Sequence, residues 1–323
     1  MSCKITVGLF VAGSLLTLGA ALADDYPSRP IRIIMPFTEG GSSDSIARAI
    51  ASELEPKFGQ RVLIENRPGA NQIIAATVTE NSPPDGYTFL WATPTLTSLN
   101  PELYKTLPYD PDKSFAPVSL LYTTREFLIV NSALHVSSLK EFIALAKAKP
   151  NAISYGSFGP GTLGHLEGIA LSKAAGIEIN HVPYKGIANI VPDLLANRIQ
   201  AVFTSVWSIL PQLHDGTLKV LALAQEQRSP NLPSVPTYKE DGIDLNMSAW
   251  LGLFAPAGTP PDIVHKVSAA FDDVVRDPAF KAKLSDAQDL VAVGSTPEYF
   301  ATFIKKDRTF WKPVIAASGI EPQ

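Results

Sequence analysis

The sequence predicts an α/β fold in which short apolar strands alternate with helices, and two observations carry this prediction. First, the apolar run Ile31–Phe37 is followed by a polar, glycine-rich turn at Thr38–Asp44 and by a helical pattern from Ser45 onward. Second, the same order recurs along the chain, with prolines and glycines between the segments. Alternation of this kind is typical of layered α/β proteins, and we expect largely parallel sheets.

The first strand–turn–helix unit is the most informative segment. Ile46, Ile50 and Leu54 recur every fourth residue, which places them on one helical face. The turn before them contains two adjacent glycines followed by two serines. Because a helix N-terminus presents free N–H groups and a positive dipole, this turn is a candidate anion site. An ordinary structural connection is the alternative.

Further strands are expected wherever apolar runs are bounded by turn residues. They are Arg61–Glu65, Thr88–Ala92, Ala116–Tyr122, Phe127–Asn131, Ile153–Ser157, Ile179–Val182, Ala201–Thr204, Lys219–Ala224 and Trp250–Ala255.

The helices begin at hydroxyl caps, several of them followed by proline. Ser137 or Ser138 caps one helix, and Thr259-Pro260 and Thr296-Pro297 open two more. The expected helices are Gln72–Thr79, Leu139–Lys149, Leu166–Ala175, Val191–Ala196, one that begins at Thr259 and one that runs from Thr296 to Ser318.

The length predicts two lobes rather than one, since about three hundred residues follow the export signal described below. We expect the chain to cross to the second lobe near Thr124–Asn131 and to return near Met247–Ala255. Residues 24–124 with 253–323 then form the first lobe, and residues 125–252 the second. Strand-end loops of the two lobes would face a shared cleft.

The first 23 residues have the pattern of a Sec-type signal peptide, with small residues before a cleavage site after Ala23. The protein is therefore expected in the periplasm. The single cysteine, Cys3, lies within this signal, so the mature chain has no disulfide. The formal net charge of −4, without a basic block, argues against a nucleic-acid partner. The five histidines lack metal-ligand spacing, and we expect neither a metal nor a cofactor.

A second glycine-rich turn lies at Tyr155–His165, where Gly159–Gly164 matches G-x-G-x-x-G. A nicotinamide site is disfavoured because the motif lies mid-chain in an exported protein. A second anion-accepting helix start, with Ser157 and Thr162 as donors, is as plausible as a purely structural turn. Of two aromatic residues that can line a cleft, Tyr184 sits in a loop, whereas core packing is the alternative for Trp250.

Several segments resemble, in the same order, the periplasmic receptors of tripartite tricarboxylate transporters, the Bug receptors. These segments are Tyr26–Ile31, Pro36-Phe37 with Gly40-Gly41 and Asp44, Glu65–Ala70, Pro84–Thr88, Leu107–Pro111, His181–Gly186 and Leu253–Pro260. The resemblance implies a two-lobed type II periplasmic-binding-protein fold that closes on a small carboxylate. It places the ligand between Thr38–Ser43 and Ser157–Thr162, with Thr93 and Thr95 completing the first wall.

The site expected from the residues and the resemblance together has sixteen members. They are Phe37, Thr38, Glu39, Gly40, Ser42, Ser43, Asp44, Thr93, Thr95, Ser157, Gly161, Thr162, His165, Tyr184, Thr204 and Ser205.

Two of these positions depart from the family pattern. Glu39 stands where the receptors commonly have a small residue or proline, and Thr204-Ser205 stands where many carry an aspartate. An ionised Glu39 in the cleft would repel a carboxylate and favour an amine, an amide or a protonated ring. If the side chain points to solvent, this effect disappears.

The function expected is non-catalytic: a monomeric receptor takes up a small organic solute and docks on membrane permease subunits. The solute is a carboxylate that carries, in one alternative, an amide, amine or pyridine group. Two other functions stay open, a secreted hydrolase that uses His165 or Ser157, and a co-receptor that presents its liganded form to a sensor kinase.

Overall fold

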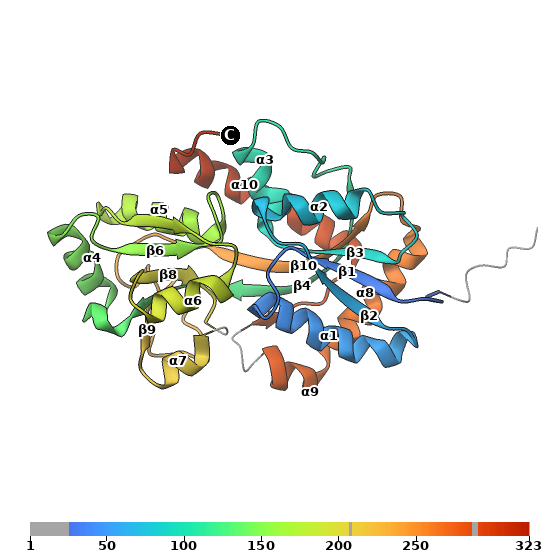
Figure 1. Cartoon of the computed structure of the whole chain (residues 1–323), viewed down its shortest axis with the longest axis horizontal. Coiled ribbons are helices and arrows are strands. Elements are labelled where there is room, and N and C mark those ends of the chain that lie inside the picture. The colour runs from blue at the N-terminus through green and yellow to red at the C-terminus, as the bar shows by residue number, and fades with distance from the viewer. Residues whose placement is uncertain (1–25, 207–208, 286–289, 323) are drawn as a thin grey trace, which may run out of the picture.

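The computed structural model describes residues 26–206, 209–285 and 290–322, and it contains two β-sheets side by side (Figure 1). The strands are β1 (Ile31–Met35), β2 (Val62–Asn66), β3 (Thr88–Ala92), β4 (Phe115–Arg125), β5 (Phe127–Asn131), β6 (Ser154–Ser157), β7 (Asn180–Pro183), β8 (Ala201–Thr204), β9 (Leu218–Leu223), β10 (Ser248–Pro256) and β11 (Val291–Ala292). The first sheet has the order β11-β4-β10-β3-β1-β2, and the second has the order β7-β6-β8-β5-β9. The α/β class expected from the sequence is confirmed.

Helices flank both sheets in Figure 1. They are α1 (Ser42–Phe58), α2 (Ile73–Glu80), α3 (Asn100–Leu103), α4 (Leu139–Ala148), α5 (Leu163–Ala175), α6 (Ile187–Leu195), α7 (Leu210–His214), α8 (Pro261–Arg276), α9 (Pro278–Phe280) and α10 (Pro297–Ser318), with short turns η1 (Ala70–Gln72), η2 (Thr95–Leu99), η3 (Ser132–Leu134) and η5 (Lys281–Ser285). Among the described helices, none carries an apolar stretch long enough to cross a membrane.

The expectation of largely parallel sheets is wrong. Strand β1 is parallel to β2 and β3, and β6 is parallel to β7 and β8, but the other described pairings are antiparallel. The reason is the connection between the sheets. Strand β10 returns from the second sheet and therefore enters the first sheet against its neighbours β3 and β4.

Strands β4 and β10 pair along nearly their whole lengths, from Phe115 opposite Pro256 to Arg125 opposite Ser248. The chain leaves the first sheet at Glu126, the single residue between β4 and β5, and returns at the start of β10. Both passages lie in the segments where the sequence predicts a crossing. The two sheets are thus joined through one strand pair.

Helix α10 packs on both sheets. Its first half places Phe300 and Ile304 in a core cluster with Trp250 of the first sheet. Its last turns place Trp311 and Ile315 in the core cluster of the second sheet, beside α5 (Figure 1). Trp250 is 1% exposed, so the core-packing alternative holds for this residue.

Asp44 holds the loop after β1 in place. Its carboxylate accepts hydrogen bonds from the Gly40 N–H (3.0 Å), Arg48 Nε (2.8 Å) and Asn66 Nδ2 (2.8 Å). Asn66 also donates to the carbonyl oxygen of Phe37 at 3.0 Å. These bonds connect the loop, the first turn of α1 and the end of β2. Burial alone raises the pKa of Asp44, but the hydrogen bonds from Arg48, Asn66 and Gly40 outweigh it and lower the pKa.

We predict that Asp44→Asn destabilises the protein at pH 7 by on the order of 1–3 kcal/mol, because charge-assisted hydrogen bonds are lost. A depressed pKa contributes stability above the unfolded-state value of about 3.9, and that contribution disappears as pH falls through the folded-state pKa. The difference between wild type and variant should therefore shrink below pH 4 in urea titrations followed by circular dichroism. Asp273→Asn, at a 69% exposed partner of Lys57, should change little at any pH. A difference for Asp44→Asn that is constant with pH would contradict the role of its charge.

We also predict that Trp311→Ala lowers the free energy of unfolding by about 3–5 kcal/mol, as expected for truncation of a fully buried aromatic ring. The neighbouring Phe310 is 44% exposed, and Phe310→Ala should cost less than about 1 kcal/mol. Equal effects of the two substitutions in urea unfolding would show that α10 does not anchor in the second sheet.

Candidate functional site

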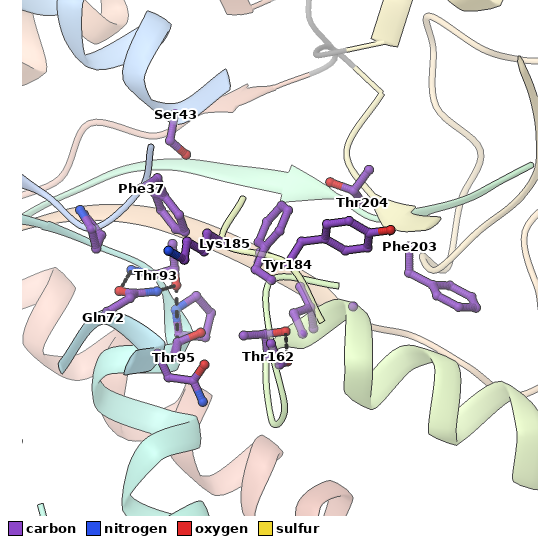
Figure 2. A pocket seen from close by; sticks show the side chains of 18 of the residues that line it. Phe37, Ser43, Gln72, Thr93, Thr95, Thr162, Tyr184, Lys185, Phe203 and Thr204 are labelled. Carbon is purple, nitrogen blue, oxygen red and sulfur yellow. Dashed lines mark hydrogen bonds between the residues drawn. The ribbon is translucent and has the colours of Figure 1, made fainter. Parts of the chain in front are cut away.

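A cavity of about 370 Å³ lies between the two sheets (Figure 2). Its lining comes from loops at the strand ends of both sheets and from the strands that join them. In Figure 2, Gln72, Thr93 and Thr95 lie on the left of the cavity, and Thr162, Phe203 and Thr204 lie on the right.

The first-sheet side is a polar wall held by its own hydrogen bonds. The Gln72 amide nitrogen donates to Thr93 Oγ1, and the Thr93 N–H donates to Gln72 Oε1 at 3.4 Å. The Thr95 N–H donates to Thr93 Oγ1, also at 3.4 Å. Phe37 and Ser43 complete this wall from the loop after β1 and the start of α1. The result is a surface of fixed amide and hydroxyl groups.

The second-sheet side is built around the start of α5. The turn from Phe158 to Gly164 lines the cavity, together with Tyr184, Lys185 and the end of β8. Thr162 is the N-cap residue of α5, but its hydroxyl donates to the Gly159 carbonyl at 2.7 Å instead of capping the helix. The N-cap of α1, Gly41, has no side chain to offer. Both helix N-termini therefore keep first-turn N–H groups without a side-chain acceptor at the cavity.

The connecting strands form a third side, which we name the strand wall and define as Thr124, Glu126, Ala249 and Leu251. Glu126 is 6% exposed, and Thr124 Oγ1 donates to its carboxyl group at 2.9 Å. Burial raises the pKa of Glu126 to about 7, and the Thr124 hydrogen bond offsets only part of this effect. Among the described lining residues, Glu126 is the one with a carboxyl group and Lys185 the one with an amino group.

The two sides touch around the rim of the cavity. Asn71 Nδ2 donates to the Pro160 carbonyl (2.6 Å) across the rim and to the Tyr104 hydroxyl (3.0 Å). The Phe37 and Phe158 rings meet edge to face with 6.0 Å between their centroids. At Gly186 a Cβ atom would lie 2.8 Å from Thr38 Oγ1, so the absence of a side chain lets these loops approach. This is the arrangement of a closed cleft.

Half of the sixteen residues expected from the sequence line the cavity, and the others are not among its lining residues. The lining residues are Phe37, Ser43, Thr93, Thr95, Thr162, Tyr184, Thr204 and Ser205. Among those that do not line it, Thr38 and Gly40 belong to the rim loop, Asp44 and Gly161 support the turns, and the Ser42 side chain lies outside the described part of the chain.

Glu39 does not face the cavity. Its side chain is 78% exposed and lies 3.4 Å from Arg48 Nη2. The sequence left open whether Glu39 points into the cleft or to solvent, and in the structure it points to solvent. The structure therefore gives no support to Glu39 as a charge that repels a bound carboxylate.

Ser157 and His165 lie behind the second glycine-rich turn. Ser157 Oγ is 2.5 Å from His181 Nε2, and the hydroxyl also contacts the Gly159 carbonyl at 3.0 Å. The Gly161 N–H donates to His165 Nδ1 at 2.9 Å, and the His165 and His181 rings stack with 4.0 Å between centroids. Burial, with the nearby His165, lowers the pKa of His181 to about 4. Because Ser157 is 1% exposed and outside the cavity lining, it lacks the access that a nucleophile needs.

Sequence reasoning missed several lining residues, including Asn71, Gln72, Glu126 and Lys185. Asn71 and Gln72 adopt positive φ angles of 48° and 70°, and the local sequence pattern, which predicts a helix from Gln72, did not predict this turn. Lys185 follows the predicted Tyr184 directly. Glu126 was detectable as a lone acid between two buried strands. No group of three or more potential metal ligands occurs among the described residues.

Comparisons with known proteins agree with this architecture. The family model described as the tripartite tricarboxylate transporter family receptor matches residues 46–320. The Bordetella pertussis protein BugT is 31% identical over 315 residues, which is 97% of this chain and 96% of BugT. The R. palustris protein Rpa4515, solved with adipate, is 32% identical with a TM-score of 0.89, covering 93% of this chain and 100% of that one.

A further solved structure is MatC from Rhodopseudomonas palustris with bound malate. It is 28% identical with a TM-score of 0.84, and the alignment covers 90% of this chain and 100% of that one. The two-lobed receptor fold that the sequence resemblance implies is thereby confirmed. The chain belongs to the tripartite tricarboxylate transporter receptor family.

Proposed function

We propose that the protein is a non-catalytic, monomeric periplasmic receptor that binds a small organic carboxylate in the cavity and delivers it to membrane permease subunits. Export would remove residues 1–23 by cleavage after Ala23. The family assignment supports the receptor role. The solutes named for two relatives, adipate and malate, support the carboxylate class.

One observation carries the proposal: the starts of α1 and α5 face a single cavity from opposite sides, and neither has a side-chain cap. Free first-turn N–H groups and the positive helix ends favour a negative charge between them. Lys185 adds a cationic side chain from the loop before α6. The hydroxyls of Thr93, Thr95 and Thr204 supply further donors for carboxylate oxygens.

Binding would draw together two bodies, residues 24–124 with 253–323 and residues 125–252. The passages at Glu126 and before β10 would act as the hinge. The ligand would shift an equilibrium between open and closed forms, because it contacts both walls only in the closed form. The rim contacts of Asn71 and Phe37 support this closure.

We predict that a thermal-shift screen of mono- and dicarboxylates, amino acids and pyridine carboxylates finds a stabilising solute. A ligand at a hundred times its dissociation constant adds about 2.7 kcal/mol to the free energy of unfolding. The bound compound should be recovered unchanged by mass spectrometry, at one per chain. Conversion of the compound, or stabilisation by none of these classes, would contradict the proposal.

We predict that Gly186→Ala weakens solute binding about tenfold or more, because the new methyl group collides with the Thr38 hydroxyl when the rim closes. The φ angle at Gly186 is 168°, an extended conformation open to alanine, so the free fold should be unaffected. Thr38→Ala removes the colliding oxygen, and the double variant should regain most of the affinity. Titration calorimetry on the wild type, the two single variants and the double variant measures these affinities. Wild-type affinity in Gly186→Ala alone would show that this contact does not form on binding.

A further inference from the structure

The strand wall and the helix behind it each hold one buried acid that the proposed function does not use. Glu126 lines the cavity, and Glu167 lies behind it on α5 with a side chain that is 0% exposed. Both carboxyl oxygens of Glu167 are buried without a hydrogen bond of normal geometry, and the Tyr238 hydroxyl is the polar group near enough to lower the pKa of Glu167. Tyr238, also fully buried, lies beside Glu167. Two buried carboxyl groups thus lie at the strand wall and directly behind it.

No ion pair among the described residues involves Glu126 or Glu167, whereas the other buried acid at this level of exposure, Asp44, is paired with Arg48. Burial raises the pKa of both Glu126 and Glu167, and the negative charge of Glu126 raises that of Glu167 further. A buried carboxylate without a nearby cation or enough hydrogen-bond donors is energetically costly. A group that brings positive charge or N–H donors to Glu126 would remove this cost.

The incoming solute is well placed to supply that group. Thr124 already donates to one oxygen of Glu126, no hydrogen bond among the described residues engages the other oxygen, and Glu126 is one of the residues that line the cavity. The anion-binding groups, two helix starts and Lys185, belong to the loop walls, whereas Glu126 belongs to the strand wall. The cavity therefore presents donors for an anion on two sides and a carboxyl acceptor on the third.

We propose that Glu126 selects the solute, and that the preferred ligand is a carboxylate bearing an ammonium or amide N–H group that donates to Glu126. This inference rests on the proposed function and names its substrate class. It assigns to Glu126 the selectivity that the sequence suggested for Glu39. Glu167 acts behind it as a buried, protonated neighbour that keeps negative charge from accumulating on the wall.

The test uses four linear compounds that differ at one end: hexanoate, adipate, the monoamide of adipate and 6-aminohexanoate. Their dissociation constants are measured by calorimetry on the mature wild-type protein, Glu126→Gln and Lys185→Gln. Circular dichroism and melting temperature confirm the fold of each variant. Because glutamine keeps the shape of Glu126 and can still accept from Thr124, it changes the charge with little change in packing.

The wild-type protein should bind 6-aminohexanoate or the monoamide at least tenfold more tightly than adipate. Glu126→Gln should raise the dissociation constant of 6-aminohexanoate at least tenfold and leave the dissociation constant of hexanoate unchanged. Lys185→Gln should instead raise the dissociation constants of all four compounds by a similar factor.

Two outcomes would overturn the inference while leaving the receptor function intact. Preferential binding of adipate, lost in Glu126→Gln, would mean that Glu126 donates a proton to a second carboxylate. If Glu126→Gln changes the dissociation constants of all four compounds by the same factor, this residue does not discriminate between solutes. Failure of the wild-type protein to bind these four compounds and every carboxylate of the thermal-shift screen would instead contradict the proposed function itself.

Discussion

The antiparallel pairing of β4 with β10 is the constraint on which the rest of the structure depends. The two strands pair from Phe115 opposite Pro256 to Arg125 opposite Ser248, with register shifts at Leu251/Gly252 and Leu253/Phe254, and end where the second sheet begins. A hydrogen-bonded strand pair resists bending along the ladder, but single residues outside it, such as Glu126, can change their dihedral angles. Stiffness within the pair and freedom at its end are what the proposed opening and closing of the cavity requires.

The same strand pair sets the chemistry of the cavity. Loops at the ends of β1, β3, β6, β7 and β8 converge from two sides and bring backbone N–H groups, hydroxyls and one lysine. The third side consists of strand residues, whose side chains alternate between faces, and it carries a single acid, Glu126. A solute is thus surrounded by donors at the loops and meets an acceptor at the strand wall. This asymmetry is the physical basis for the proposed selection of one end of a ligand over the other.

A second layer of residues holds the loops without touching the cavity. Asp44 fixes the loop after β1 through Gly40 and Asn66, and His165 fixes the second glycine-rich turn through the Gly161 N–H. These residues stand in the segments that the sequence identifies as binding loops, yet their polar atoms are engaged by the protein itself. Preorganised loops lose less conformational entropy when a ligand binds, so this layer contributes to affinity indirectly.

The sequence by itself determined the alternation of strands and helices, the two crossings and the two helix starts at the site, because these follow from local apolar periodicity and from glycine, hydroxyl and proline signals. Ser43, Thr162 and Tyr184 were predictable for that reason, whereas Thr93 was expected from the family resemblance. Only the tertiary structure decided that Glu39 turns to Arg48 and water and that Ser157 is buried. It also decided that Glu126 meets Glu167, a residue 41 positions away in the numbering. Side-chain direction and the meeting of distant residues depend on how the two sheets are joined, and no local pattern encodes that.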